Sequence, residues 1–240
     1  MANLFEYLLN KIFKPKFFDE KKIFKIVDIQ NKKLDLLNAL IGKRIKLTSE
    51  PHSFFHKRVS IRNFSGKALN KEYFSEIIFN SLGIRKDKSP KKEYSLEPRT
   101  FPSAGGLNLI ESAIYVHNVS GIEKGIYLYN PYTEELILLK SKVLLEDLLP
   151  YCQNINLNQA NFVIFFISNI QPGMIKYGLR SYRYVLLEAG HAAQNILLNL
   201  PKYGLGGVCL GAFNDKKLRK ELNILKDYQN EYVVVCGGIK

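Results

Sequence analysis

Lys176 and Tyr177 stand side by side directly before Gly178, which leads into a helical pattern over residues 181–200. A lysine whose ammonium group is desolvated and placed among cations loses its proton more readily, so it can act as a general base. A neighbouring tyrosine can share that proton or anchor a ring. The chain has 35 Lys and Arg against 22 Asp and Glu, and this net charge of +13 favours such a role for the lysine. The simpler alternative is a surface lysine beside a packed tyrosine.

Two arginines flank a serine at alternate positions, as Arg58, Ser60 and Arg62. In an extended segment these side chains point to one side of the backbone. Arginine donates two parallel hydrogen bonds to phosphate oxygens, so the arrangement suits a phosphate together with the polar edge of a heterocycle. A surface segment of a basic protein would show the same pattern.

Two stretches of small residues invite a ligand interpretation. The first comprises Pro102, Ser103, Ala104, Gly105 and Gly106. Glycine and alanine permit close backbone approach to a planar ligand, although an ordinary loop is the alternative. The second stretch, residues 203–213, is expected to be a glycine-rich loop. Its spacing is not GxGxxG and it follows a helix, which excludes a dinucleotide-binding turn.

Glu188 and His191 form an ExxH pair on one face of the predicted helix over 181–200. A di-iron site needs two such motifs and further glutamates, and the sequence has no second ExxH. No CxxC occurs either, so we expect no metal site. His191, Gln194 and Asn195 are expected to orient the helix or to line a subunit interface.

Three segments together resemble the SagB/ThcOx-type dehydrogenases, a branch of the flavin-dependent nitroreductase superfamily that oxidises azoline rings in ribosomal peptides. They are KRVSIRNF (57–64), FPSAGG (101–106) and KYGLRSYRYVLLEAGHAAQN (176–195). The resemblance covers roughly residues 55 to 238 and implies a nitroreductase-like fold, with FMN bound at the interface of a homodimer. It also implies a precursor peptide as substrate and a cyclodehydratase as partner.

The resemblance implies a role for each matching residue. Lys176, assisted by Tyr177, would remove a proton from one carbon of a thiazoline or oxazoline ring, and the flavin would take a hydride from the next carbon. Arg180 and Arg183 would position the peptide or the helix start. Relatives carry a second basic residue where this chain has Val59. The expected cofactor contacts are Arg58, Ser60, Arg62, Pro102, Ser103, Ala104, Gly106, Leu210 and Gly211, with the 102–106 turn supplied by the second subunit.

Two other functions stay open on the residues alone. The first keeps the fold and changes the chemistry to an NAD(P)H-dependent reductase of nitro or quinone compounds. The second is a flavin-free scaffold subunit that binds an anionic peptide or nucleic acid in a modification complex, which the loss of a basic residue at Val59 allows.

The elements that must position these residues follow from periodicity and turn residues. The helix over 181–200 is expected to bury Leu186, Ala189, Ala193, Ile196, Leu197 and Leu200. Helices and strands mix without strict βαβ alternation, which indicates an α+β fold with a central, mostly antiparallel sheet flanked by helices. The expected elements are a helix over 69–82, strands over 112–119, 125–139 (a hairpin), 161–168 and 232–238, and helices over 181–200 and through Leu218 and Leu222.

Residues 1–50 are expected to form a helical extension, and residues 51–240 the flavin domain. A spacing of four among apolar residues predicts an amphipathic helix over 3–13, docked on protein or, alternatively, lying on a membrane surface. The scattered positive charge argues against a nucleic-acid groove. Three cysteines without a pairing pattern, no signal peptide and no spanning segment predict a cytoplasmic protein.

Overall fold

The computed structural model describes residues 28–32, 54–86, 98–150, 152, 154–222 and 228–240. The chain divides into two compact units, Met1–Pro51 and His52–Lys240. In the first unit, residues 28–32 are helical, with 2.8 Å between Lys32 Nζ and Asp28 Oδ2. The helix predicted over 3–13 and most of the rest of the predicted extension, residues 1–50, lie outside the described residues.

The second unit is built on a six-stranded sheet whose neighbouring strands are all antiparallel, in the order β3-β2-β1-β4-β6-β5. This confirms the predicted antiparallel sheet. All seven residues of β4 are buried, as its continuous apolar run predicts. The strands are β1 Ile110–Val116, β2 Gly125–Asn130, β3 Glu135–Lys140, β4 Phe162–Ser168, β5 Leu205–Leu210 and β6 Gln229–Gly238.

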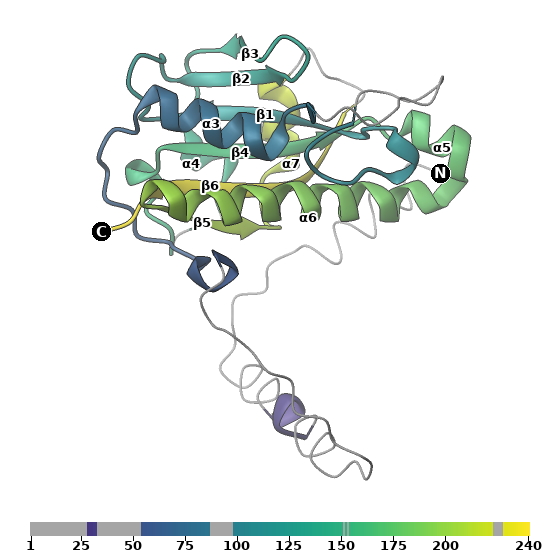
Figure 1. The fold of residues 1–240 in the computed structure, drawn as a ribbon, viewed down its shortest axis with the longest axis horizontal. Helices are drawn as coiled ribbons and strands as arrows, with labels where there is room; N and C mark the ends of the chain where they lie inside the picture. The colour runs from purple at the N-terminus through teal and green to yellow at the C-terminus, as the bar shows by residue number, and fades with distance from the viewer. Residues whose placement is uncertain (1–27, 33–53, 87–97, 151, 153, 223–227) are drawn as a thin grey trace. The chain divides into compact units, whose positions relative to one another are not determined.

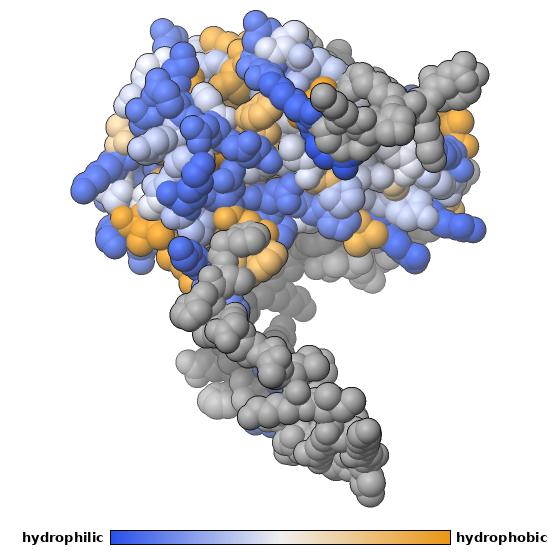
Figure 2. Space-filling model, in the orientation of Figure 1, coloured by the Kyte–Doolittle hydropathy of each residue, from blue (hydrophilic) through white to orange (hydrophobic). Residues whose placement is uncertain are grey.

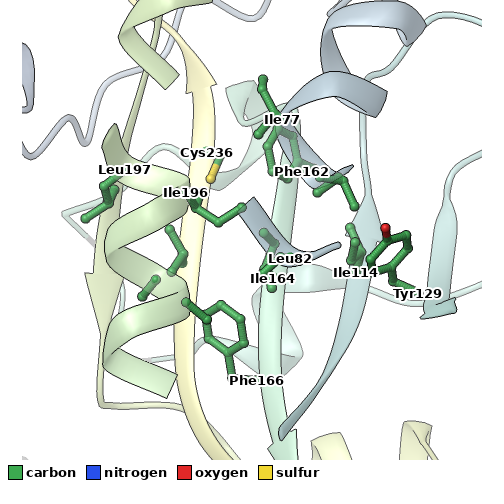
Figure 3. Close-up of a cluster of buried hydrophobic side chains, with 14 of the residues drawn as sticks. Ile77, Leu82, Ile114, Tyr129, Phe162, Ile164, Phe166, Ile196, Leu197 and Cys236 are labelled. Carbon is green, nitrogen blue, oxygen red and sulfur yellow. The ribbon is translucent and has the colours of Figure 1, made fainter. Parts of the chain in front are cut away.

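Helices cover both faces of this sheet (Figure 1). The long helices α3 and α6 lie on one face, and the short helices α4 and α7 lie on the other. Side chains alternate between the two faces along β4, so Ile164 packs towards α6 while Phe165 packs towards the opposite layer. Each face of the sheet thus contributes to its own cluster of buried side chains, and Figure 3 shows part of the larger cluster, which faces α3 and α6. The helices are α3 Lys71–Leu82, α4 Leu145–Leu148, α5 Gln171–Tyr177, α6 Ser181–Asn199 and α7 Asp215–Glu221.

The ends of α3 and β1 have identifiable causes. Asn70 caps α3, because its Oδ1 accepts from the backbone N–H groups of Glu72 at 2.8 Å and Tyr73 at 3.1 Å. β1 ends at Val116, earlier than predicted, because the N–H groups of His117 and Asn118 both turn to the carbonyl oxygen of Asn161, at 2.9 Å each.

The prediction of a glycine-rich loop over 203–213 is wrong, because residues 205–210 form β5. The glycines lie in this strand because its neighbours leave no room for side chains. A Cβ on Gly206 would lie 2.3 Å from Ile61 Cγ1, and one on Gly207 would lie 2.9 Å from Leu200 Cδ1. Glycine within a strand often marks such a close approach.

The predicted burial of Leu186 is also wrong, since its side chain is 57% exposed. The buried face of α6 follows Val185, Glu188, Ala189 and Ala192 at spacings of three and four. Leu186 falls about 100° around the helix from Val185, outside that stripe. Among the described residues, no helix is long and apolar enough to cross a membrane.

The buried centre of β4 should dominate the stability of this unit. Ile164 is fully buried, so Ile164→Ala should lower the free energy of unfolding by about 2–5 kcal/mol through lost contacts and a residual cavity. Leu138→Ala on β3, where the side chain is 46% exposed, should lower it by about 1 kcal/mol or less. Urea unfolding of both variants measures the difference, and equal losses would contradict this account of the core.

Candidate active site

Lys176 and Tyr177 are the last two residues of α5, a short helix that the sequence analysis did not predict. The helix follows β4 and begins with Pro172 in its first turn, which is the signal that could have indicated it. It ends at Gly178, whose φ of 59° and ψ of −142° fall in a region that is essentially restricted to glycine. The pair was expected on the glycine turn itself, but it ends helix α5, and the turn ahead of the long helix begins only at Gly178.

The turn of small residues from 102 to 106 lies directly against this pair. The Nζ atom of Lys176 is 3.5 Å from the carbonyl oxygen of Gly105. A Cβ on Gly105 would lie 2.2 Å from the Tyr177 hydroxyl oxygen and 2.5 Å from Lys176 Nζ, so a larger residue there would have to displace both side-chain ends. The Tyr177 ring also packs edge-on against Tyr184, with centroids 4.9 Å apart. Two of the predicted segments thus meet within one chain.

Glu188 lies in the protein interior beneath this turn, 1% exposed. Its Oε1 accepts from the N–H of Ile110 at 3.2 Å, while the Ser103 hydroxyl accepts from the N–H of Asn108 at 2.8 Å. Burial raises the pKa of Glu188, and hydrogen bonds from Ser103, Ile110 and Leu109 oppose that rise. In the sequence, Glu188 was considered only as a possible metal ligand, as part of the ExxH motif. Its position on the buried stripe of α6 was the signal for a structural role.

The segment that enters the turn is fixed by a second buried group, Arg99, which is 5% exposed. Its guanidinium donates to the carbonyl oxygen of Leu82 from Nε at 2.9 Å and from Nη2 at 2.7 Å. Its Nη1 lies 4.0 Å from Glu111 Oε2. Desolvation lowers the pKa of Arg99 and raises that of Glu111, and the attraction between the two charges opposes both shifts.

The exposed face of α6 and its entry carry the remaining residues predicted near the substrate. Asn195 orients the helix, since its Nδ2 donates to the carbonyl oxygen of Thr100 at 3.1 Å. Arg180, Arg183, His191 and Gln194 are exposed. Lys176 is exposed as well, so this chain alone does not supply the desolvation that a lysine base requires.

The predicted phosphate-binding segment lies beside β5. Ser60 bridges Gly207, and the N–H of Ile61 donates to the carbonyl oxygen of Gly207 at 3.2 Å. Arg58 is half-buried near Cys209, and its charge partly offsets the rise in the pKa of that thiol that burial causes.

This part of the site is otherwise open to solvent. Ser60, Arg62 and Gly211 are exposed, and Leu210 is half-buried at the end of β5. The segment with Arg58, Ser60 and Arg62 follows the short helix η1 Phe54–Lys57. Figure 1 shows that η1 lies away from α5, the helix that carries Lys176 and Tyr177. The structure thus brings the segment of Arg58, Ser60 and Arg62 to β5, the strand that ends at Leu210 just before Gly211. In the part of the chain that the structure describes, no group of three or more His, Cys, Asp or Glu could hold a metal ion.

The domain is a six-stranded antiparallel sheet flanked by helices, which is the nitroreductase fold. The Nitroreductase family model matches residues 56–238. Over 173 residues the chain is 33% identical to a Methanocaldococcus jannaschii protein provisionally named a nitroreductase, covering 72% of this chain and 83% of that protein. The chain therefore belongs to the nitroreductase family of oxidoreductases.

Solved structures share the fold. A provisionally named nitroreductase from Anabaena variabilis superposes with a TM-score of 0.64 at 29% identity, over 78% of this chain and 37% of that one. A chain of the E. coli microcin synthetase McbBCD complex, solved with truncated pro-MccB17 bound, gives a TM-score of 0.70 at 18% identity. That match covers 100% of this chain and 92% of the other.

Substitution of Gly105 should disturb the Lys176–Tyr177 pair, and Gly106 offers a matched control. Both glycines have positive φ, 61° and 68°, so alanine at either position should cost about 1–2 kcal/mol of strain. A Cβ on Gly106 meets nothing within 4 Å, whereas one on Gly105 meets both side chains. We expect Gly105→Ala alone to change the acetylation rate of Lys176, measured by peptide mass spectrometry. Equal rates in both variants would show that the turn does not constrain the pair.

The raised pKa of Glu188 predicts a pH-dependent effect on stability. Its contribution to the free energy of unfolding is fully present below about pH 4.5, the ordinary pKa of this group, and is lost as the pH rises through the higher folded-state pKa. Glu188→Gln removes this titration, so the variant should gain stability relative to the native chain between pH 4.5 and 8. Urea unfolding across that range tests this. The exposed Glu72→Gln is the control, and a constant difference between native chain and Glu188→Gln would contradict the shift.

Proposed function

We propose that this protein is an FMN-dependent dehydrogenase that oxidises thiazoline or oxazoline rings of a ribosomally made precursor peptide to the corresponding azoles. One observation carries the proposal: the Lys176–Tyr177 pair lies against the backbone of Gly105, in the turn that the sequence resemblance places beside the flavin. The fold shared with a chain of the microcin synthetase complex, which has a truncated precursor bound, supports a peptide substrate and a partner in a complex, which the sequence resemblance implies to be a cyclodehydratase.

The residues beside β5 have the chemistry that FMN requires. Arg58 would hold the phosphate, and Arg62 the pyrimidine edge, because guanidinium groups donate to phosphate and carbonyl oxygens. Ser60 and the backbone N–H groups near Leu210 and Gly211 would complete this half. A structure of the same fold is described as an oxidoreductase containing FMN. When bound, FMN accepts the hydride and passes the electrons to oxygen or another acceptor.

The other half of the cofactor site would come from a second subunit, through its turn containing Pro102, Ser103, Ala104 and Gly106. The surface around α5 and α6 supports a homodimer, because a row of large apolar side chains there is exposed: Ile175 by 89%, Leu179 by 74%, Leu186 by 57% and Leu187 by 50%. Burying such a patch against a second copy is favourable. The same contact would remove water from Lys176 and so supply the desolvation that a base requires.

The chain's own groups would move the proton. Lys176 Nζ would take the proton from the ring carbon, and the Tyr177 hydroxyl would share it or anchor the ring. Arg180 and Arg183, both exposed at the start of α6, would hold the peptide. A reductase of nitro or quinone compounds that uses NAD(P)H is the second candidate, favoured by the 33% identity to a protein named as a nitroreductase.

The test combines the visible spectrum with two variants. We expect flavin bands in the purified protein, FMN on mass analysis of the released chromophore, and loss of two hydrogens from a synthetic thiazoline peptide. Arg58→Ala should weaken FMN binding by about 1.5–3 kcal/mol, roughly 10- to 150-fold. Lys176→Ala should abolish ring oxidation with FMN still bound. Lys176→Arg, which keeps the charge but has no usable base, should fail equally.

Different outcomes separate the alternatives. Rapid bleaching of the flavin by NADH or NADPH, together with an untouched thiazoline peptide, would favour the nitro or quinone reductase. Full activity of Lys176→Arg would remove the base role and leave a cationic one. A colourless protein that cannot be loaded with FMN would refute both enzyme functions.

A further inference from the structure

A groove of about 740 Å³ lies between α3 and the hairpin formed by β2 and β3, away from the residues of the candidate active site. This volume is within the range of sites that bind small molecules or peptide segments. Figure 2 shows an apolar patch over β2 and β3 bordered by hydrophilic side chains. One wall is formed by Phe74 and Ile78 of α3, and the floor by Tyr127 and Tyr129 of β2.

The floor of the groove is aromatic. Tyr129 is 4% exposed, and its hydroxyl is shielded from solvent and close enough to Arg99 to interact with its charge. The neighbouring Tyr127 is also buried, and its hydroxyl donates to the carbonyl oxygen of Glu123 at 2.8 Å. The floor therefore presents the two rings to a ligand.

Carboxylates stand at both ends of the groove in a chain of net charge +13. Glu123 lies near the start of α3, where Gly121 approaches the side chain of Lys71. Glu134 and Glu135 lie near the end of α3, where Lys86 pairs with Glu134 at 3.0 Å. All three glutamates are exposed.

The dimensions suit an extended chain. From Lys71 to Phe79 the helix rises about 12 Å, at roughly 1.5 Å per residue. This length fits about four residues of extended peptide. The groove is bounded by β3, which pairs only with β2 among the described strands and exposes Ile137 and Leu138 by 46% each. Such an apolar edge strand is a surface to which an extended segment can pair.

We propose that this groove binds an extended peptide segment with about four apolar residues flanked by basic ones. The apolar residues lie on Tyr127 and Phe74, and the basic residues meet Glu123 and Glu135. That the segment belongs to the precursor peptide rests on the proposed function, whereas the binding chemistry of the groove does not.

Fluorescence anisotropy of the full chain in 150 mM salt tests the proposal. The probe is a fluorescein-labelled peptide, Lys-Arg-Val-Phe-Val-Arg-Lys, and its acidic counterpart, Glu-Glu-Val-Phe-Val-Glu-Glu, serves as the reference. We expect saturable binding of the basic probe alone. Glu123→Lys combined with Glu135→Lys should weaken it by about fivefold or more, because two attractive pairs become repulsive. The matched control, Glu72→Lys with Glu146→Lys, has the same net charge and should bind as the native chain does.

Ile137→Ser gives a second measurement. Because Ile137 lines the groove and is 46% exposed, the substitution should leave the unfolding midpoint nearly unchanged, yet weaken the probe several-fold through lost apolar contact. Equal binding of the basic and acidic probes, or equal loss in the groove and control variants, would overturn the proposal. Neither measurement uses flavin, so a failure here is distinct from a failure of the proposed dehydrogenase.

Discussion

The buried carboxyl group of Glu188 is the point on which the site depends. It comes from the face of α6 that packs on the sheet, and it accepts from the backbone of Ile110 where β1 begins. A carboxyl group in this position needs such donors, because burial without them is strongly unfavourable. By fixing the 103–110 segment from the interior, it allows the backbone of Gly105 to meet Lys176 and Tyr177 on the outer side. The geometry of the turn therefore depends both on this core helix and on the turn's own hydrogen bonds, in which Ser103 accepts from the N–H groups of Gly106 and Asn108.

The elements predicted correctly are those whose signal is local. The apolar run of β4, the hairpin through Asn130 and the stripe of α6 each depend on spacing within one segment. The contact between Gly105 and Lys176 joins residues 71 positions apart, so the sequence indicates each segment but not their meeting. β5 was missed for a related reason. Its glycines suggested a loop from the sequence alone. In the structure, Ile61 and Leu200, which come from distant segments, occupy the space that larger side chains would need.

The wrong assignment of Leu186 to the core has a physical meaning. The spacing of apolar residues along a helix indicates which residues are buried in the assembled protein. It does not indicate whether the chain's own sheet or another subunit covers them. Helix α6 already buries one face on the sheet, and Leu186 and Leu187 on this helix are exposed, as Leu179 just before it is. A single chain leaves this surface open and leaves Lys176 in solvent. A lysine in solvent cannot easily act as a base, so the proposed base role of Lys176 requires the proposed second subunit.

The strand order also relates the groove to the proposed base. β2 ends beside the start of β1, and the start of β1 pairs with the end of β4, from which α5 follows. The end of the groove that carries Glu134 and Glu135 therefore lies at the same end of the sheet as Lys176. From β3 to β4 there are three strand intervals, about 14 Å at roughly 4.8 Å each. An extended chain crosses that distance with about four or five residues. Under the proposed function, a peptide held in the groove would have to cross these strands before a ring on it could reach the end of the sheet where α5 begins. Because β4 is fully buried, the spacing of the strands that it would cross is fixed by the core.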